Sequence, residues 1–583
     1  MGSSWKATFS IVLLYLFVSK CCGSEYGGSQ MGTLRVDASE SSGQLIPQTF
    51  FGIFFEAGGP NIPSNIAPWG IIGKESSVIV STDRSSCFER NKIALKMEVL
   101  CDSKGANSCP SEGVGIYNPG FWGMNIEQGK QYKVALYVRS SGSINVSIEL
   151  KASNWLQKLA ATNIIASASE VSDWKKIEVV LEAKGSDSNS SLHLTTTSKG
   201  VIWFDQVSVM PLDTYKGHGF RTDLIEMMAD LKPRFFRFPG GCFVEGEWLR
   251  NAFRWKETIG PWEERPGHFG DVWMYWTDDG MGYFEFLQLA EDLGTLPIWV
   301  FNNGISHQDE VDTSSVLPFE ALDGIEFARG EANSTWGAVR FAMGHPEPFD
   351  LRYLDHPADL YDYHVYTSSS DMFSRGRHFD SASRSGPKAF VSEYAVTGKD
   401  AGQGSFLAAL GEAGFLIGLE KNSDAIDMVS YAPLFVNTND RRFFTESSGA
   451  TLHKTTLQMN SYNSIAESAI SWKSSEDDKT YLRIKIVNYG AETVNIIISV
   501  DGLDPNSVKL SGSTKTVLTS KNLMDENSFK EPNKIVPTQS LLETDGGDME
   551  VVLPPHSITS FDLLKETSSI KIAGADSIAR SSM

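Results

Sequence analysis

The sequence predicts a mixed fold, α/β plus all-β. It consists of an incomplete α/β barrel of the TIM type, a β-sandwich inserted near the start of the barrel and a second β-sandwich after it. Over residues 213–447, helical segments alternate with short apolar runs, which is typical of βα units around a parallel sheet. On either side, alternating runs recur between Gly, Ser and Asp clusters, as in antiparallel sandwiches. A chain of 583 residues is long enough for about three cores.

Residues 1–24 have the layout of a secretory signal peptide. Lys6 precedes an apolar run from Ala7 to Ser19, and small residues follow at Gly23 and Ser24. The run is too short to span a bilayer, and no later stretch of the sequence reaches the necessary length. We therefore expect a secreted, soluble protein outside the cytosol.

The composition favours a neutral partner. Lys and Arg number 51 against 72 Asp and Glu, a net charge of −21, which disfavours nucleic acid and anionic membranes as partners. Aromatic residues make up 11% of the chain and include 14 Trp, a richness that suits stacking on sugar rings. We expect no cofactor.

The cysteines and the glycosylation sequons agree with secretion. Cys21 and Cys22 leave with the signal peptide. The four cysteines that remain are Cys87, Cys101, Cys109 and Cys242. The first three crowd into one short region, so we expect one disulfide among them, with the pairing open. Potential glycosylation sites are Asn145, Asn189 and Asn333.

Two predicted strands in residues 32–75 join the barrel to the first β domain. They are Thr33–Val36 and Thr49–Glu56, and the second ends at Glu56.

The inserted β-sandwich is predicted over residues 76–212, where no helical period occurs. Its strands are expected at Ile93–Leu100, Tyr132–Val138, Ile144–Leu150, Lys176–Leu181, Leu192–Thr197 and Val201–Val209. Aromatic side chains here either line a sugar-binding face or, on the simpler interpretation, fill the core; they are Tyr117, Phe121, Trp122, Trp155 and Trp174.

The barrel region, residues 213–447, is short of strands. Helices are expected at Arg221–Leu231, Gly282–Leu293, Phe319–Arg329 and Ser405–Lys421. Strands are expected at Arg234–Gly241, Leu296–Asn302, Tyr361–Thr367, Lys388–Ala395 and Met428–Val436. With the strand ending at Glu56 these make six, whereas a closed barrel needs eight. Phe349–Tyr353 begins like a strand, but Leu354–Pro357 follows at once without a crossover helix, so we expect the fourth and fifth strands to be missing here.

A second β-sandwich is predicted over residues 448–566. Its strands are expected at Tyr481–Val487, Val494–Val500, Met549–Leu553 and Ser557–Leu564. Residues 567–583 are Ser-rich and are expected to form a loose tail.

One carboxylate stands out at a strand end. Lys388–Ala395 is an apolar run that carries Glu393, and Gly398 and Gly402 follow before a helix. In a parallel barrel the carboxyl ends of the strands build the active site, so Glu393 is positioned for chemistry. The alternative is an ordinary exposed Glu.

Five motifs in order carry a family resemblance. They are Phe238–Phe243, Trp255–Pro261, Phe301–Gly304, His364–Tyr366 and Val391–Ala395. Together they resemble the plant α-L-arabinofuranosidases of glycoside hydrolase family 51, from Gly32 to Lys565, with an insert similar to a carbohydrate-binding module. The resemblance implies an extracellular, cell-wall enzyme that releases terminal arabinofuranose from arabinoxylan, arabinan or arabinogalactan by a retaining mechanism, which uses two carboxyl groups roughly 5 Å apart.

The resemblance also implies roles for individual residues. Glu393 is similar to the nucleophile, and Tyr366 to a tyrosine close to it. Glu56 matches an acceptor of sugar hydroxyls, Cys242 a position beside the sugar, and Trp255 part of the pocket wall. For Cys242, buried packing is the simpler alternative, because a reactive thiol would lack a readable His partner.

The sequence departs from the family at the general acid/base. The family carries this Glu in a Gly-Asn-Glu motif on the fourth strand, and no Gly-Asn-Glu occurs in the chain. Phe55–Gly58 and Arg442–Phe444 also look shortened, which indicates exon skipping or a defective gene model. Candidate replacement acids are Glu245, Glu247, Asp309 and Glu310, and the sequence selects none of them.

Three hypotheses remain open from the sequence. The chain is a retaining arabinofuranosidase impaired by loss of its acid, an inactive binder of wall glycans, or the product of an incomplete transcript. We predict no metal site, because metal-ligand spacing is absent around His307, His345, His356 and His364.

Overall fold

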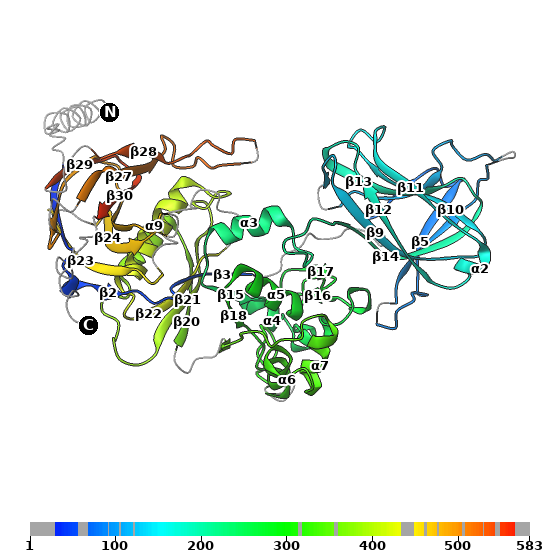
Figure 1. Cartoon of the computed structure of the whole chain (residues 1–583), viewed down its shortest axis with the longest axis horizontal. Helices are drawn as coiled ribbons and strands as arrows, with labels where there is room; N and C mark the ends of the chain where they lie inside the picture. The colour runs from blue at the N-terminus through cyan, green and yellow to red at the C-terminus, as the bar shows by residue number, and fades with distance from the viewer. Residues whose placement is uncertain are drawn as a thin grey trace, which may run out of the picture. The chain divides into compact units, whose positions relative to one another are not determined.

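The computed structural model describes residues 30–55, 68–90, 92–103, 107–120, 123–312, 318–354, 360–432, 448–459, 463–474, 477–503, 508–528, 530–542 and 548–565. The predicted signal peptide, Glu56 and the predicted tail lie outside these residues. The chain divides into two compact units, residues 51–357 and residues 1–50 with 358–583 (Figure 1). Among the described residues, no helix combines the length and the apolar character that crossing a bilayer requires.

The insert in the 51–357 unit is a β-sandwich. Its strands are β4 (Gly70–Ile72), β5 (Val78–Asp83), β6 (Ala94–Val99), β7 (Val114–Asn118), β8 (Met124–Ile126), β9 (Gln131–Ser140), β10 (Ile144–Lys151), β11 (Lys158–Ala166), β12 (Lys175–Glu182), β13 (Asp187–Thr196) and β14 (Gly200–Pro211). One sheet has the order β11-β10-β13-β7-β4, with β8 beside β13, and the other has the order β12-β9-β14-β6-β5. A short helix, α2 (Ala168–Val171), precedes β12.

Strict alternation in the sequence explains why the two sheets pack face to face. In β9, Val134, Leu136 and Val138 point inward and are buried, while the residues between them are partly exposed. Because successive side chains of a strand point to opposite faces, this pattern gives each sheet one apolar face to bury.

The expected disulfide joins Cys101 to Cys109, with the sulfur atoms 2.00 Å apart. The prediction of one bond among the three clustered cysteines is confirmed. Cys87 stays outside the disulfide, and burial raises the pKa of its thiol to about 11, which disfavours a reactive thiolate there.

The aromatic side chains of the insert do not simply fill its core. Trp155 is 44% exposed and packs edge-on against Tyr117, with the ring centroids 4.5 Å apart. Both rings also contact the buried His193. Trp174 is half-buried and donates from its indole to the Ser85 carbonyl at 3.0 Å. Phe121 and Trp122 lie outside the described residues.

His193 should make the stability of the insert depend on pH. Burial, reinforced by the nearby charge of Lys151, lowers the pKa of His193 from 6.5 to about 4. As the pH falls from 6.5 to 4, the unfolded chain binds a proton that the folded sandwich does not. The free energy of unfolding therefore has its full value above pH 6.5, and it decreases by up to about 3 kcal/mol as the pH falls to 4.

The measurement is the free energy of unfolding in urea from pH 7 to pH 4, for the wild type and for His193→Gln. The glutamine cannot take up the proton, so the wild type should lose more stability over this range than the variant. Equal losses in the two proteins would contradict a neutral, buried His193.

The α/β part of the 51–357 unit contains four parallel strands. Its elements are β3 (Phe51–Phe54), α3 (Thr222–Asp230), β15 (Phe235–Phe238), α4 (Gly241–Glu245), β16 (His268–Gly270), β17 (Tyr275–Thr277), α5 (Tyr283–Leu293), β18 (Leu296–Trp299), α6 (Pro318–Arg329), α7 (Thr335–Ala342) and β19 (Tyr353–Leu354). The parallel order is β19-β18-β15-β3, and β16 and β17 form a separate antiparallel ribbon.

Local sequence signals define α5. The Glu285 carboxylate accepts the Gly282 N–H at 2.9 Å, which satisfies one of the free donors at the start of the helix. Gly294 ends the helix in the left-handed conformation, at φ 67°, which glycine adopts without strain. These two signals bound the helix where the sequence predicts it.

The other unit combines three parallel strands with a large, mostly antiparallel sheet. Its elements are β1 (Gln30–Asp37), β2 (Gln44–Leu45), β20 (Leu360–Thr367), α8 (Ser369–Ser374), β21 (Lys388–Val396), α9 (Phe406–Lys421), β22 (Ile426–Ser430), β23 (Thr451–Met459), β24 (Ile465–Lys473), β25 (Thr480–Asn488), β26 (Val494–Asp501), β27 (Val508–Thr519), β28 (Thr538–Leu541), β29 (Met549–Leu553) and β30 (Ser557–Lys565). The parallel order is β22-β21-β20.

The predicted C-terminal sandwich is one sheet of ten strands, in the order β28-β27-β30-β25-β24-β23-β1-β26-β29 with β2 beside β23. It incorporates the N-terminal strand β1, which pairs with β23 and β26. Its two halves bury a common core, to which β1 and β26 contribute Leu34 and Ile496, and β25 and β30 contribute Ile484 and Phe561.

Helix α9 packs between β21 and the large sheet. It is mostly apolar and buried on every side, and Phe406, Leu410 and Phe415 are fully buried together with Val391 of β21 and Ile470 of β24. A helix without a polar face is stable only in such an interior position.

The ladders among the described residues do not confirm a closed barrel. The predicted strand at Phe349–Tyr353 survives as β19, only two residues long and paired with β18. The predicted strand Met428–Val436 starts earlier, at Ile426, and β22 ends at Ser430; residues 433–436 lie outside the described residues. Across the described residues, the fold is mostly β.

Candidate active site

Glu393 lies near the carboxyl end of β21, where it is 6% exposed. Strand β21 is buried along nearly its whole length, between β20 and β22 and against α9. The parallel register sets Glu393 opposite His364 and Ala395 opposite Tyr366. Because side chains alternate along a strand, His364, Tyr366 and Glu393 belong to one face.

Two side chains of β20 contact the Glu393 carboxylate. The Tyr366 hydroxyl donates a hydrogen bond to Glu393 Oε2 at 2.7 Å. His364 Nδ1 lies 3.6 Å from the same oxygen. The structure therefore brings together the predicted nucleophile and the predicted tyrosine.

A second layer of polar contacts orients His364. Its Nε2 lies 3.0 Å from Asp362 Oδ2 and 2.7 Å from Ser392 Oγ. The Ser392 hydroxyl donates to Asp362, so it accepts from His364, and these partners assign a hydrogen to Nε2. The imidazole is thus held between Asp362 and Glu393.

The sequence reasoning missed Asp362, His364 and Ser392 as site residues. Asp362, His364 and Tyr366 occur at every second position of β20, a spacing that puts three polar side chains on one face. That spacing beside the Glu393 strand is the signal that could have identified them.

Cys242 and Trp255 belong to the 51–357 unit, and Glu393 belongs to the other. Trp255 is only 3% exposed, and its indole donates to the Glu320 carbonyl at 3.0 Å. It packs against Trp299 and Trp336. A small cavity is lined by Phe253, Trp255, Trp299, Val300, Phe301, Asn302, Glu320 and Ala321. Trp255 is therefore mainly a core residue with one edge on a cavity.

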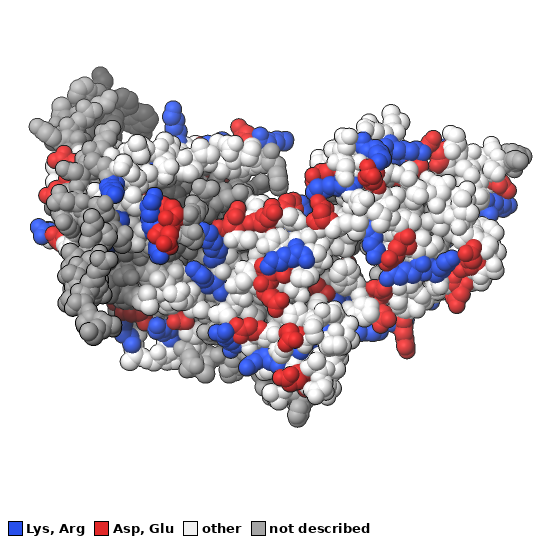
Figure 2. Space-filling view, in the orientation of Figure 1, with Lys and Arg blue, Asp and Glu red and all other residues white. Residues whose placement is uncertain are grey.

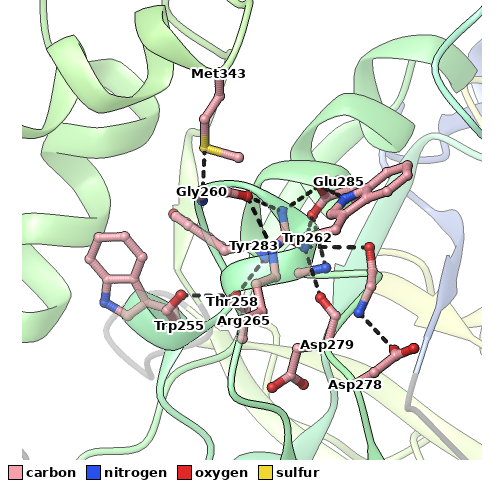
Figure 3. Close-up of polar contacts among 12 residues, drawn as sticks. Trp255, Thr258, Gly260, Trp262, Arg265, Asp278, Asp279, Tyr283, Glu285 and Met343 are labelled. Carbon is pink, nitrogen blue, oxygen red and sulfur yellow. Dashed lines mark hydrogen bonds and ion pairs between the residues drawn. The ribbon is translucent and has the colours of Figure 1, made fainter. Parts of the chain in front are cut away.

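A buried ion pair holds the loop that carries Trp255 (Figure 3). The Arg265 guanidinium contacts both oxygens of Glu285, at 2.8 and 3.0 Å, and donates to the Gly260 carbonyl at 2.9 Å. Thr258 links the two segments, because its hydroxyl donates to the Trp255 carbonyl and accepts the Tyr283 N–H. The loop is thus fastened to the first turn of α5.

The surroundings of Cys242 correct the interpretation that its thiol has no His partner. Ligand atoms of Cys242, Glu245 and His307 lie within 4.8 Å of one another. The prediction of no metal site relied on the spacing of histidines along the sequence. That spacing could not reveal this cluster, because folding brings His307 to Cys242 and Glu245 from a distant part of the chain.

The candidate replacement acids are mostly engaged in local contacts. The Asp309 carboxylate accepts the Leu249 N–H at 2.8 Å. Glu245 and Glu247 both lie near His307, with oxygen–nitrogen distances of 3.1 and 3.3 Å. Glu310 is exposed. No single carboxylate among these emerges as a general acid.

The remaining predicted site residues have simple positions. Glu56 lies outside the described residues. The three sequon asparagines, Asn145, Asn189 and Asn333, are all exposed.

On the face drawn in Figure 2, the acidic and basic side chains of the described residues are interspersed, without a broad basic area.

Comparison with known proteins decides the family. The chain matches the model of the alpha-L-arabinofuranosidase 1 domain over residues 227–355 and that of the alpha-L-arabinofuranosidase C-terminal domain over residues 392–557. It is 57% identical to alpha-L-arabinofuranosidase 1 of Arabidopsis thaliana, over 98% of each chain. The chain belongs to the plant α-L-arabinofuranosidases of glycoside hydrolase family 51. It is also 54% identical to the Arabidopsis alpha-L-arabinofuranosidase 2, over 100% of this chain and 99% of the relative.

This arabinofuranosidase family member is shorter than its plant relatives. The alignment with the Arabidopsis alpha-L-arabinofuranosidase 1 extends over 671 positions, 88 more than the 583 residues of the chain. At least 88 of the aligned positions therefore have no counterpart in this chain.

A solved structure shares the fold. The arabinose-bound structure of the MgGH51 α-L-arabinofuranosidase superposes with a TM-score of 0.78, at 24% sequence identity, over 92% of this chain and 100% of the other. The family member thus keeps the overall family fold despite the missing positions.

Proposed function

We propose that this chain is a secreted glycoside hydrolase that removes terminal α-L-arabinofuranosyl residues from cell-wall polysaccharides by a retaining mechanism. The observation that carries the proposal is the buried Glu393 carboxylate at the end of a parallel strand, with the Tyr366 hydroxyl 2.7 Å from it. Family membership supports the reaction class, and the names of the relatives support arabinofuranosides as substrates.

In this mechanism Glu393 attacks the anomeric carbon of the furanose. The bond to the leaving oxygen breaks as a glycosyl ester forms on Glu393, and water then hydrolyses the ester. The Tyr366 hydroxyl holds the carboxylate in position for attack. As the negative charge leaves Glu393, the Tyr366 hydrogen bond weakens, and it strengthens again when the carboxylate is released.

The chain lacks a general acid of the family type, so the leaving group must depart without protonation from Gly-Asn-Glu. Three observations support this: the motif is absent from the sequence, β19 is two residues long, and at least 88 aligned positions are missing. Loss of general acid catalysis costs about 10²-fold to 10⁴-fold in rate. The same absences support an incomplete barrel in the region of the fourth and fifth strands.

The cell-wall assignment follows from the sequence features. The segment at residues 1–24 directs the chain to the secretory pathway, and Asn145, Asn189 and Asn333 are acceptors for glycosylation. The acidic chain favours neutral glycans such as arabinoxylan, arabinan or arabinogalactan over polyanions.

The alternative is an inactive binder of wall glycans. The exposed Trp155 ring beside Tyr117 favours it, because exposed aromatic faces stack on sugar rings. A product of an incomplete transcript would have neither activity nor glycan affinity.

The test compares a 2,4-dinitrophenyl α-L-arabinofuranoside, whose leaving group needs no protonation, with arabinan. We expect clear turnover of the aryl substrate with α-arabinofuranose as the first product in NMR spectra. On arabinan we expect rates about 10²-fold to 10⁴-fold below those of the Arabidopsis relative. A protein that turns over neither substrate but binds to an arabinan column would support the glycan-binding alternative. A protein without turnover and without arabinan binding would support the incomplete transcript.

A further inference from the structure

Three side chains of different metal-binding chemistry meet at the carboxyl end of β15. The Cys242 Sγ, a carboxylate oxygen of Glu245 and a ring nitrogen of His307 all lie within 4.8 Å of one another. Cys242 and Glu245 are three residues apart on α4 and so share one face of its turn, whereas His307 comes from the loop after β18. Tertiary packing alone creates this cluster.

Backbone hydrogen bonds fix the loop against α4. The His307 N–H donates to the Gly246 carbonyl at 3.1 Å, and the Gln308 N–H donates to the Glu247 carbonyl at 2.9 Å. The Asn302 side-chain amide adds a bond to the Val244 carbonyl at 2.9 Å. The three side chains are therefore held together by main-chain contacts that do not depend on a ligand.

Two carboxylates contact the two nitrogens of the His307 ring. Its Nε2 lies 3.1 Å from Glu245 Oε2, and its Nδ1 lies 3.3 Å from Glu247 Oε1. Gln308 in turn donates to the other Glu247 oxygen at 3.1 Å. With an ion on Nε2, the Nδ1–H donates to Glu247, an outer carboxylate contact that metal-bound histidines commonly make.

We propose that Cys242, Glu245 and His307 bind a divalent ion of the zinc class. A thiolate, an imidazole and a carboxylate form the mixed donor set that suits Zn²⁺, whereas Ca²⁺ and Mg²⁺ prefer oxygen ligands only. The His307 and Glu245 side chains are 31% and 32% exposed, so an ion can reach them from solvent. Binding releases the thiol proton of Cys242 and leaves the fourth position of the ion to water.

An ion at this site would also affect catalysis, an effect that rests on the proposed function. The family resemblance implies that Cys242 stands beside the sugar, so an ion bound there would compete with the substrate. Metal binding itself does not depend on that implication.

The test uses the full chain, stripped of metal, titrated with Co²⁺ and then with Zn²⁺. Cobalt bound to a thiolate gives a charge-transfer band in the near ultraviolet, which reports ligation by cysteine directly. We expect one Co²⁺ per chain with this band, displaced by Zn²⁺. Among the described residues, Cys87 is the other cysteine outside the disulfide. The variant Cys87→Ser is therefore the matched control, and this variant should keep the band.

The variants test each ligand in turn. Cys242→Ser should abolish the band, and His307→Ala and Glu245→Gln should each weaken Co²⁺ affinity at least about 10-fold. Glu247→Gln, which leaves all three ligands intact, should weaken it about 10-fold. Circular dichroism checks that each variant is folded. A wild type without the band, or a band that persists in Cys242→Ser, would overturn the site.

Activity separates this proposal from the proposed function. Zn²⁺ should inhibit turnover of the aryl arabinofuranoside competitively in the wild type and much less in His307→Ala. Stoichiometric binding without inhibition would contradict the sugar-side position of Cys242 and leave the metal site standing. Turnover with no cobalt binding would overturn the metal site alone.

Discussion

Replacement of Glu393 by alanine should lower kcat on the 2,4-dinitrophenyl arabinofuranoside by about 10⁴-fold or more. The carboxylate is 6% exposed and fixed by Tyr366, so the truncated side chain leaves no group that can attack the anomeric carbon. The activated leaving group removes any need for an acid, and the measured loss therefore reports the nucleophile. Initial rates and the free energy of unfolding should be measured together.

Azide provides a second readout of the same variant. With the carboxylate gone, azide can occupy the space that the carboxylate leaves and attack the anomeric carbon from that face. The product should be the β-arabinofuranosyl azide, because a single displacement inverts the configuration. Glu550→Ala, an exposed Glu of β29 in the same unit, is the matched control and should keep wild-type turnover. Undiminished turnover by Glu393→Ala would refute the nucleophile assignment.

Replacement of Lys485 by methionine should destabilise the protein by about 3–5 kcal/mol. Lys485 of β25 forms an ion pair with Glu420 of α9, and both side chains are only 1% exposed. Removal of the ammonium takes its ion-pair partner away from a carboxylate that is buried where α9 packs against the large sheet. Urea-induced unfolding at pH 7 should detect the loss.

Two further proteins make this prediction specific. Lys473→Met breaks a solvent-exposed pair with Asp478 in the same unit, whose side chains are 61% and 87% exposed, and should change stability by less than about 1 kcal/mol. The double variant Lys485→Met/Glu420→Leu buries no charge and should recover most of the lost stability. Equal losses of unfolding free energy in Lys485→Met and Lys473→Met would show that the buried pair stabilises the protein no more than the exposed pair does.

Local sequence patterns predicted most long elements. The alternation of Val134, Leu136 and Val138 predicted β9, and the glycines at 282 and 294 bound α5, because propensity and periodicity act over a few residues. Short elements such as β16, β17 and α4 were missed, and so were the longer elements α7, β11, β23, β24 and β27. The short elements are three to five residues long, which is too short for a periodic pattern of side chains.

The sequence alone determined the acidic character, the family motifs, the absence of Gly-Asn-Glu and the candidate role of Glu393 at a strand end. Only the tertiary structure decided which side chains meet that carboxylate. The register between β20 and β21 sets His364 and Tyr366 beside Glu393, and loop packing brings His307 to Cys242. Such contacts join residues far apart in the chain, and their partners depend on strand order and loop closure, which a local pattern of side chains does not encode.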